Sequence, residues 1–254
     1  MRVVILCGGM GTRLREETEF RPKPMVPIGG RPILWHIMKH YAHHGYDEFV
    51  CALGYKGDVI KSYFYEYCAL EKDVTINLAT GVCTSRAAAK ENWRVHLIDT
   101  GFKTNTGGRI RRLREHFPEE PFFLSYGDSV SNVDLDALLA FHKERGKTVT
   151  LTAVRSPARF GEVTLEDEYV RVFDEKPQQG EGWINGGFMV IEPDFHDYLR
   201  DDSTGLEVLR EVAADGRLTG YRHPGYWQCM DNIRDRELLE SEWESGRAPW
   251  KIWE

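Results

Sequence analysis

Cysteine is scarce in this sequence and is not arranged in a way that indicates disulfides or a zinc site. The 254 residues include five cysteines, with no CxxC spacing and no cysteine–histidine pair at zinc-ligand spacing. An odd number of thiols in or beside apolar runs is typical of a reduced, cytoplasmic protein. We therefore expect a cytoplasmic location, and we interpret Cys7, Cys51 and Cys83 as small core side chains.

Long apolar runs and an excess of positive charge are also missing. The first apolar run, residues 3–7, is too short for the core of a signal peptide, and no segment approaches the roughly 20 apolar residues of a membrane-spanning helix. The net charge of −7 disfavours binding to nucleic acid or to an anionic membrane. Four arginines cluster between Arg109 and Arg114, but their spacing around Ile110 and Leu113 predicts a solvated helix face. We expect neither nucleic acid nor a membrane as a partner.

The sequence does contain a repeated alternation of apolar and amphipathic segments. The predicted strands span residues 3–7, 48–53, 75–78, 94–98, 122–126, 148–154, 161–165, 169–173 and 184–191. The predicted helices span residues 32–44, 56–67, 108–116, 134–145, 206–215 and 232–245. Alternation up to residue 147 predicts a largely parallel sheet with helices on both faces, and the short β-rich segments after it predict partly antiparallel strands. We expect one α/β domain over residues 1–254, of the Rossmann-like three-layer type with a mostly parallel, mixed central sheet.

A glycine-rich loop follows the first predicted strand. Gly8, Gly9 and Gly11 let backbone N–H groups turn toward an anion, and Arg13 can grip phosphate with two hydrogen bonds. A plain tight turn fits the same glycines, so the loop alone leaves both alternatives open. The spacing differs from the G-x-G-x-x-G dinucleotide motif, and no Gly-Lys-Ser/Thr of a P-loop follows. Downstream, Lys23 stands between two prolines that stiffen the backbone around it, which suits a triphosphate but also an ordinary surface loop.

Two aspartates are candidate metal ligands. Asp128 follows the predicted strand 122–126 and should emerge at the same sheet edge as the glycine loop, where a cation between phosphates needs oxygen ligands. Asp231 comes just before the last predicted helix, and on spacing alone a helix cap is the favoured interpretation.

The combined motifs resemble those of a known enzyme family. GGMGTRL followed by RPKPMVPIGGRPIL is similar to the sugar-1-phosphate nucleotidylyltransferases, and within that group the chain looks most like the glucose-1-phosphate cytidylyltransferases. The segments that carry the latter resemblance are KPMVPIGGRPILWHIMKHY, GYKGDVIKSYF, TGGRIRRL, RFGEVTL, EKP, INGGF, HPGYWQCMDNIRD and APWKIWE, which run from end to end.

The resemblance implies transfer of a cytidylyl group from CTP to glucose 1-phosphate, giving CDP-glucose and pyrophosphate by in-line attack assisted by Mg²⁺. It assigns Mg²⁺ to Asp128 and Asp231, the leaving pyrophosphate to Arg13, and the charge around the α-phosphate to Lys23. Arg13, Lys23 and Asp128 would be catalytic. The implied nucleotide contacts, in a part covering about residues 1–147, are Leu6, Gly8, Gly9, Gly11, Thr12, Arg13, Lys23, Thr106, Gly107, Arg109 and Asp128. The implied sugar phosphate contacts, in a part covering about residues 148–254, are Gly161, Glu175, Lys176, Asn185 and Gly186.

Several of these segments also fit interpretations without a ligand. The Glu175–Lys176 pair fits a solvated strand end, Asn185–Gly186 fits a β-bulge, and Thr106–Gly107 fits an ordinary helix start. The family habit of assembling, together with tryptophans near the end of the sequence, favours a homo-oligomer.

The sequence also departs from the cytidylyltransferase pattern, with Ser129 where a glycine is expected after the metal aspartate. Alternatives within the group are another nucleoside triphosphate or another sugar phosphate. A non-catalytic nucleotide-sugar sensor would be expected to lose a metal ligand or Lys23, and neither is lost. A glycosyltransferase would be expected to carry a D-x-D motif, which Asp128-Ser129-Val130 does not supply.

Overall fold

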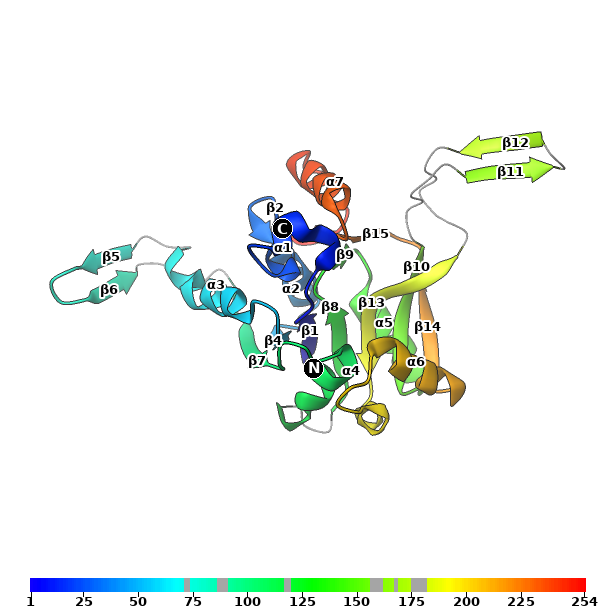
Figure 1. The fold of residues 1–254 in the computed structure, drawn as a ribbon, viewed down its shortest axis with the longest axis horizontal. Helices are drawn as coiled ribbons and strands as arrows, with labels where there is room; N and C mark the ends of the chain where they lie inside the picture. The colour runs from blue at the N-terminus through cyan, green and yellow to red at the C-terminus, as the bar shows by residue number, and fades with distance from the viewer. Residues whose placement is uncertain (71–73, 86–90, 117–119, 156–161, 167–168, 175–181) are drawn as a thin grey trace.

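A seven-stranded sheet forms the centre of the computed structural model, which describes residues 1–70, 74–85, 91–116, 120–155, 162–166, 169–174 and 182–254 (Figure 1). The order of the strands across the sheet is β14-β10-β13-β8-β1-β4-β7. These strands span Leu218–His223 (β14), Val149–Arg155 (β10), Trp183–Ile191 (β13), Phe122–Tyr126 (β8), Val3–Cys7 (β1), Glu48–Leu53 (β4) and Arg94–Asp99 (β7). Within this sheet β13 alone runs antiparallel to its neighbours, β10 and β8, while all other pairs are parallel. The prediction of a mostly parallel, mixed α/β sheet is confirmed.

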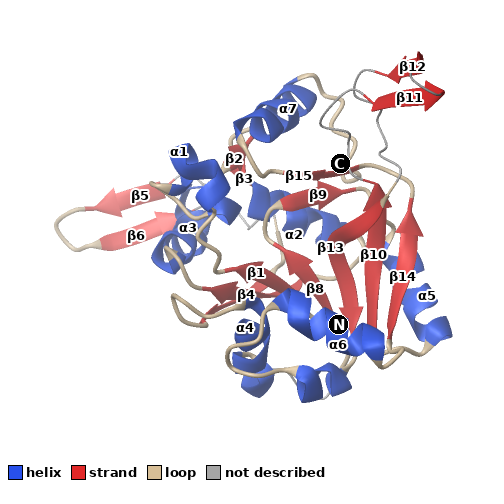
Figure 2. Cartoon of the chain, turned by 45° about the vertical axis from the view of Figure 1, so that its right-hand side comes forward, coloured by secondary structure: helices blue, strands red, loops and turns tan. Residues whose placement is uncertain are grey.

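Helices cover both faces of the sheet, because strands buried on both sides present alternate side chains to each face. On one face, Val3 and Ile5 of β1 pack in a core with α2 (Ile33–His43) and α5 (Leu135–Arg145). On the other face, Val4 packs in a second core with α4 (Thr106–Arg112) and α6 (Gly205–Ala214). The turned view shows α4 and α6 together, away from α2 (Figure 2). This is the predicted three-layer arrangement.

The remaining elements surround the sheet. The helices among them are α1 (Arg15–Thr18), α3 (Gly57–Leu70), α7 (Ile233–Glu244) and 3₁₀ helices at Thr12–Leu14, Lys23–Met25, Arg114–His116 and Pro193–Tyr198. Four short pairs of strands complete the described part of the chain: β2 (Pro27–Ile28) with β3 (Arg31–Pro32), β5 (Val74–Asn77) with β6 (Val82–Ser85), β9 (Ser129–Ser131) with β15 (Trp227–Cys229), and β11 (Glu162–Glu166) with β12 (Tyr169–Asp174). The β5–β6 and β11–β12 hairpins project from opposite sides of the body (Figure 1). The β9–β15 pair joins two segments far apart in the sequence.

The end of the chain packs against the chain's own core. The Trp250 side chain is 1% exposed, Trp253 is buried too, and both belong to the core on the α2 face. The ring of Trp243 lies 4.7 Å from that of His36 in α2. These tryptophans therefore no longer argue for contacts with another subunit. Among the described residues, no helix combines the length and apolarity needed to cross a lipid bilayer.

Candidate active site

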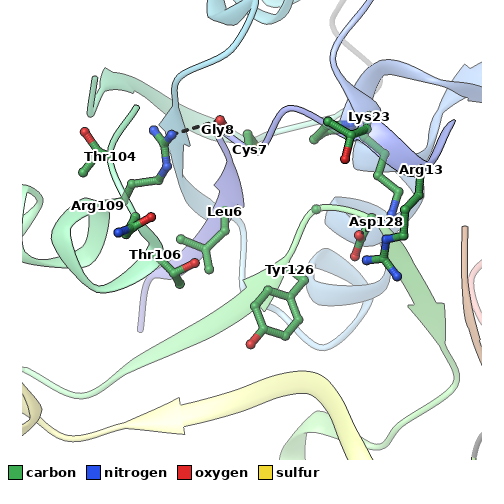
Figure 3. Close-up of a pocket in the computed structure, with 16 residues that line it drawn as sticks. Leu6, Cys7, Gly8, Arg13, Lys23, Thr104, Thr106, Arg109, Tyr126 and Asp128 are labelled. Atoms are coloured by element: carbon green, nitrogen blue, oxygen red, sulfur yellow. Dashed lines mark hydrogen bonds and ion pairs between the residues drawn. The ribbon is translucent and has the colours of Figure 1, made fainter. Parts of the chain in front are cut away.

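A cavity of about 390 Å³ opens at the carboxyl end of β1 and β8 (Figure 3). Apart from Gly107, every residue that the sequence assigned to the nucleotide lines it. These residues are Leu6, Gly8, Gly9, Gly11, Thr12, Arg13, Lys23, Thr106, Arg109 and Asp128. Arg13, Lys23 and Asp128 lie on one side and Arg109, Thr104 and Thr106 on the other (Figure 3). The carboxyl edge of an open parallel sheet is where such folds usually bind ligands.

The glycine loop has different steric demands at each position. A Cβ on Gly9 would meet nothing within 4 Å, so this residue faces open space. Gly11 has φ of 61°, in the left-handed region that favours glycine. A Cβ on Gly8 would lie 2.2 Å from the Cζ atom of Arg109, so only glycine lets the guanidinium approach the loop this closely. One side of the loop is therefore open toward the cavity, and the other side packs against the guanidinium of Arg109.

Arg109 holds the loop from that side. Its Nη2 donates to the Gly8 carbonyl at 2.9 Å, and its Nη1 donates to the carbonyls of Leu53 and Gly101 and to the Thr100 hydroxyl. The residue is 6% exposed, and burial lowers the pKa of its guanidinium, with repulsion from Arg112 acting in the same direction. The prediction of a solvated helix face is therefore wrong for Arg109, because its side chain turns inward to backbone carbonyls.

The two glycines at the start of α4 serve helix packing. The N–H of Gly107 donates to the Ser203 carbonyl at 3.0 Å, and a Cβ there would lie 2.3 Å from the Ser203 hydroxyl oxygen. At Gly108 a Cβ would lie 2.2 Å from the Asp201 carbonyl oxygen. These contacts account for the glycines without a ligand.

Lys23 lies between the two aspartates proposed from the sequence. Its Nζ atom is 2.7 Å from Asp128 Oδ2 and 2.7 Å from Asp231 Oδ1. The other oxygen of Asp231, Oδ2, accepts from Arg13 at 2.5 Å. Lys23 is 8% exposed, whereas the Arg13 side chain is 72% exposed. Two cations thus neutralise two carboxylates at the edge of the cavity.

The charges in this cluster support one another. Burial alone would lower the pKa of Lys23, but attraction to Asp128 and hydrogen bonds to both aspartates raise it above its ordinary value. Burial would raise the pKa of Asp231, but the hydrogen bond and charge of Lys23 and the charge of Arg13 bring it below its ordinary value. The ammonium and the Asp231 carboxylate are therefore both ionised near neutral pH.

Asp231 is not the cap of α7. That role belongs to Asn232, whose side chain accepts from Asp235 N, while the Asp235 carboxylate accepts from Asn232 N at 3.2 Å and from Asp231 N at 2.8 Å. The cap interpretation of Asp231 is therefore wrong. Its carboxylate is directed to the cavity cations.

The predicted sugar contacts are placed only in part. Gly161, Glu175 and Lys176 lie outside the described residues. Asn185 and Gly186 lie in β13 at a β-bulge, since the pairing with β10 jumps from Leu151↔Met189 to Ala153↔Asn185.

The glycines at this bulge fill sterically restricted positions. The Gly186 carbonyl accepts from Trp227 Nε1 at 2.8 Å, and Gly187 has φ of 81°. A Cβ on Gly187 would lie 2.4 Å from Cδ2 of Tyr126. The bulge accounts for these glycines, and a contact with sugar stays a prediction.

Sequence reasoning missed two residues beside the aspartates. Tyr126 lines the cavity, and its hydroxyl accepts from Asn185 Nδ2 at 3.5 Å. The thiol of Cys229 lies beside both aspartates, and one ligand atom from each of Asp128, Cys229 and Asp231 falls within 4.8 Å of the others. Burial and the nearby carboxylates raise the pKa of this thiol. The only signal in the sequence was the position of Cys229 two residues before Asp231.

Comparisons with known proteins agree with this geometry. A family model described as nucleotidyl transferase matches residues 2–231. A glucose-1-phosphate cytidylyltransferase of Salmonella typhi is 48% identical over 257 residues, covering all of both chains. A probable glucose-1-phosphate cytidylyltransferase of Bacillus subtilis (strain 168) is 40% identical over 256 residues, again covering all of both. A solved UDP-glucose pyrophosphorylase complexed with UDP-glucose has a TM-score of 0.68 at 16% identity, covering 97% of this chain and 99% of that one. The last similarity bears on the fold alone.

Proposed function

The chain belongs to the nucleotidyl transferase family, and from this premise we propose that it transfers the cytidylyl group of CTP to glucose 1-phosphate, giving CDP-glucose and pyrophosphate. The full-length identity of 48% to a glucose-1-phosphate cytidylyltransferase carries the choice of substrates. The arrangement of Lys23 between Asp128 and Asp231, beside the glycine-loop cavity, supports the reaction type.

The reaction needs positioning and charge stabilisation more than acid or base chemistry. An oxygen of the sugar phosphate is already ionised, so it can attack the α-phosphorus of CTP in line. The bond to the bridging oxygen of the β-phosphate breaks, and pyrophosphate carries the electron pair away. We assign to Lys23 the stabilisation of the charge that builds on the α-phosphate, and to the exposed Arg13 the binding of the leaving pyrophosphate.

Asp128 and Asp231 are the residues that would hold Mg²⁺. Both offer carboxylate oxygens, the hard ligands that Mg²⁺ prefers, and these oxygens lie within 4.8 Å of each other. The Asp128 side chain is 27% exposed toward the cavity, which leaves room for phosphate oxygens and water. When bound, Mg²⁺ would neutralise phosphate charge that otherwise repels the incoming sugar phosphate.

The proposed acceptor pocket follows from the motif resemblance and from the bulge in β13. Asn185 contacts Tyr126, which lines the cavity, and Gly186 follows it at the bulge in β13. We assign both residues to the sugar together with Gly161, Glu175 and Lys176. A cytoplasmic location and a homo-oligomer also remain proposals, and light scattering of the purified protein tests the second.

Pyrophosphate release tests the function directly. The assay combines Mg²⁺ and glucose 1-phosphate with CTP, UTP, dTTP, ATP or GTP, and compares wild type with Asp128→Ala. Asp136→Ala is the matched control, because that aspartate is exposed and binds His44 away from the cavity. We expect release with CTP alone, lost in Asp128→Ala and kept in Asp136→Ala. Release with another triphosphate would move the chain to a neighbouring specificity, and no release with any of the five would refute the proposed substrates.

A further inference from the structure

Cys229 lies beside the proposed metal site, and the proposed reaction gives its thiol no role. It is the last residue of β15 and pairs with Ser129, the first residue of β9, directly after Asp128. Asp231 follows the end of β15 by two residues, and one oxygen of its carboxylate lies within 4.8 Å of the Cys229 sulfur. The short β9–β15 ladder therefore brings together a thiol and two carboxylates from segments far apart in the sequence.

The three groups are close enough to share one ion. One ligand atom each from Asp128, Cys229 and Asp231 lies within 4.8 Å of the other two, and the thiol hydrogen-bonds to the Asp231 carboxylate. Around a tetrahedral Zn²⁺, bonds of about 2.1 Å to oxygen and about 2.3 Å to sulfur would place the oxygen and sulfur ligands about 3.6 Å apart. Because no pair of these atoms is more than 4.8 Å apart, the groups need to close by little more than an ångström at most to reach that spacing.

A second observation at the same place indicates an unused polar ligand group. Ser129 is 2% exposed, and its hydroxyl has no hydrogen-bond partner among the described residues. Directly opposed residues of an antiparallel pair place their side chains on the same face, so the Ser129 hydroxyl lies on the side of Cys229. A buried hydroxyl without a partner costs free energy unless something binds it.

We propose that Asp128, Cys229 and Asp231 form a mixed oxygen and sulfur site that binds a thiophilic divalent cation, Zn²⁺ in the first place, more tightly than Mg²⁺. The proposal rests on the assignment of the two aspartates as cation ligands under the proposed function. Zn²⁺ accepts thiolate and carboxylate ligands together, with a fourth position left for water or phosphate, whereas Mg²⁺ gains little from sulfur.

Binding of Zn²⁺ would change the charges around the two aspartates and the thiol. The zinc–sulfur bond forms as the S–H bond breaks, and the thiol proton passes to solvent. The Lys23 ammonium, 2.7 Å from each carboxylate, has to leave its position between them as the ion enters. Zn²⁺ and Mg²⁺ then compete for the same pair of carboxylates, so the thiol makes this site sensitive to zinc.

The decisive measurement is the ultraviolet charge-transfer band that appears when Cd²⁺, a thiophilic stand-in for Zn²⁺, binds to a thiolate. The full chain is titrated with Cd²⁺ alone, without nucleotide, as wild type, Cys229→Ser and Cys51→Val. The last is the matched control, because Cys51 is a fully buried thiol in β4. We expect the band in wild type and in Cys51→Val, and its loss in Cys229→Ser. A band that persists in Cys229→Ser, or is absent from wild type, would overturn the proposal.

Affinities provide the second measurement. In competition with a chromogenic chelator, Cys229→Ser should bind Zn²⁺ at least about tenfold more weakly than wild type, while its Mg²⁺ affinity by calorimetry stays within about twofold. Equal loss for both ions would mean general damage to the site and would refute a specific sulfur ligand. Asp128→Asn, which keeps the thiol, should weaken the Cd²⁺ band if thiol and carboxylate share the ion, and an undiminished band would contradict sharing.

Neither measurement involves CTP. An inactive protein that shows the band would refute the proposed function and leave the mixed site standing. An active protein without the band would support the proposed function and refute the mixed site.

Discussion

Replacing Lys23 with methionine removes the ammonium that lies 2.7 Å from an oxygen of Asp128 and 2.7 Å from an oxygen of Asp231. The two carboxylates, with oxygens within 4.8 Å of each other, then repel across a partly buried gap. Two unit charges at that separation cost about 3.5 kcal/mol at an effective dielectric constant of about 20. Water at the partly exposed Asp128 screens part of this repulsion. We therefore expect the free energy of unfolding at pH 7 to fall by about 2 kcal/mol.

The expected assay is thermal unfolding of the metal-free protein with and without added Mg²⁺. A loss of about 2 kcal/mol corresponds to a Tm lower by about 4–8 °C in a protein of this size. Because a divalent cation can take over the role of the missing ammonium, Mg²⁺ should raise the Tm of Lys23→Met by more than it raises that of wild type. Lowering the pH toward 5 should also reduce the difference, since one aspartate of the unscreened pair can accept a proton.

Lys39→Met is the matched control for this experiment. The Lys39 ammonium lies 3.6 Å from Glu91, away from the cavity, so its loss removes a lysine–carboxylate ion pair without touching either aspartate. Its response to Mg²⁺ should equal that of wild type. If Mg²⁺ shifts the Tm of Lys23→Met no more than that of wild type, Lys23 does not stand in for a cation between the aspartates, and the reasoning fails.

Three further outcomes are expected. In Arg109→Lys, the single ammonium cannot reach all the acceptors that the guanidinium contacts, so KM for the triphosphate should rise at least about tenfold in steady-state kinetics. An unchanged KM would contradict the role of Arg109 in holding the glycine loop. Gly187→Ala should lower the urea-derived free energy of unfolding by at least about 1 kcal/mol, because φ is 81° and the new Cβ would meet Tyr126; a neutral effect would count against the bulge geometry. Burial lowers the pKa of His36 from 6.5 to about 4, so between pH 6.5 and pH 4 the unfolded chain binds a proton at this residue that the folded chain does not. The free energy of unfolding should therefore fall by about 1.3 kcal/mol from pH 7.5 to pH 5.5 because of His36. His36→Gln should lack that part of the pH dependence.

The sequence predicted most of the regular parts of the fold because their signals are local, but it missed β14 at the edge of the central sheet. Apolar runs fixed the bounds of β1, β4 and β8 without error, and Asp134 does cap α5 by accepting from Ala137 N. The short strand β9 was missed, because three residues carry no readable alternation. Its pairing with β15 depends on contacts across the whole domain.

The candidate site was predictable where consecutive residues line it, as in the glycine loop and Lys23. Arg109 was misjudged because an arginine turned toward carbonyls looks, in sequence, like one in water. Its environment comes from Leu53, Thr100 and Gly8, which belong to other parts of the chain. Cys229 escaped notice for a similar reason, since only tertiary pairing brings it to Asp128.

The carboxylate that fixes the start of α7 also fixes the backbone of Asp231. Asp235 accepts hydrogen bonds from Asp231 N and Asn232 N, so the helix start and the candidate ligand share one anchor. For protein engineering, this places a surface helix terminus among the positions to which catalysis is sensitive. Libraries that vary Asn232 or Asp235 to improve solubility or thermostability should lose activity at these two positions before they lose folded protein.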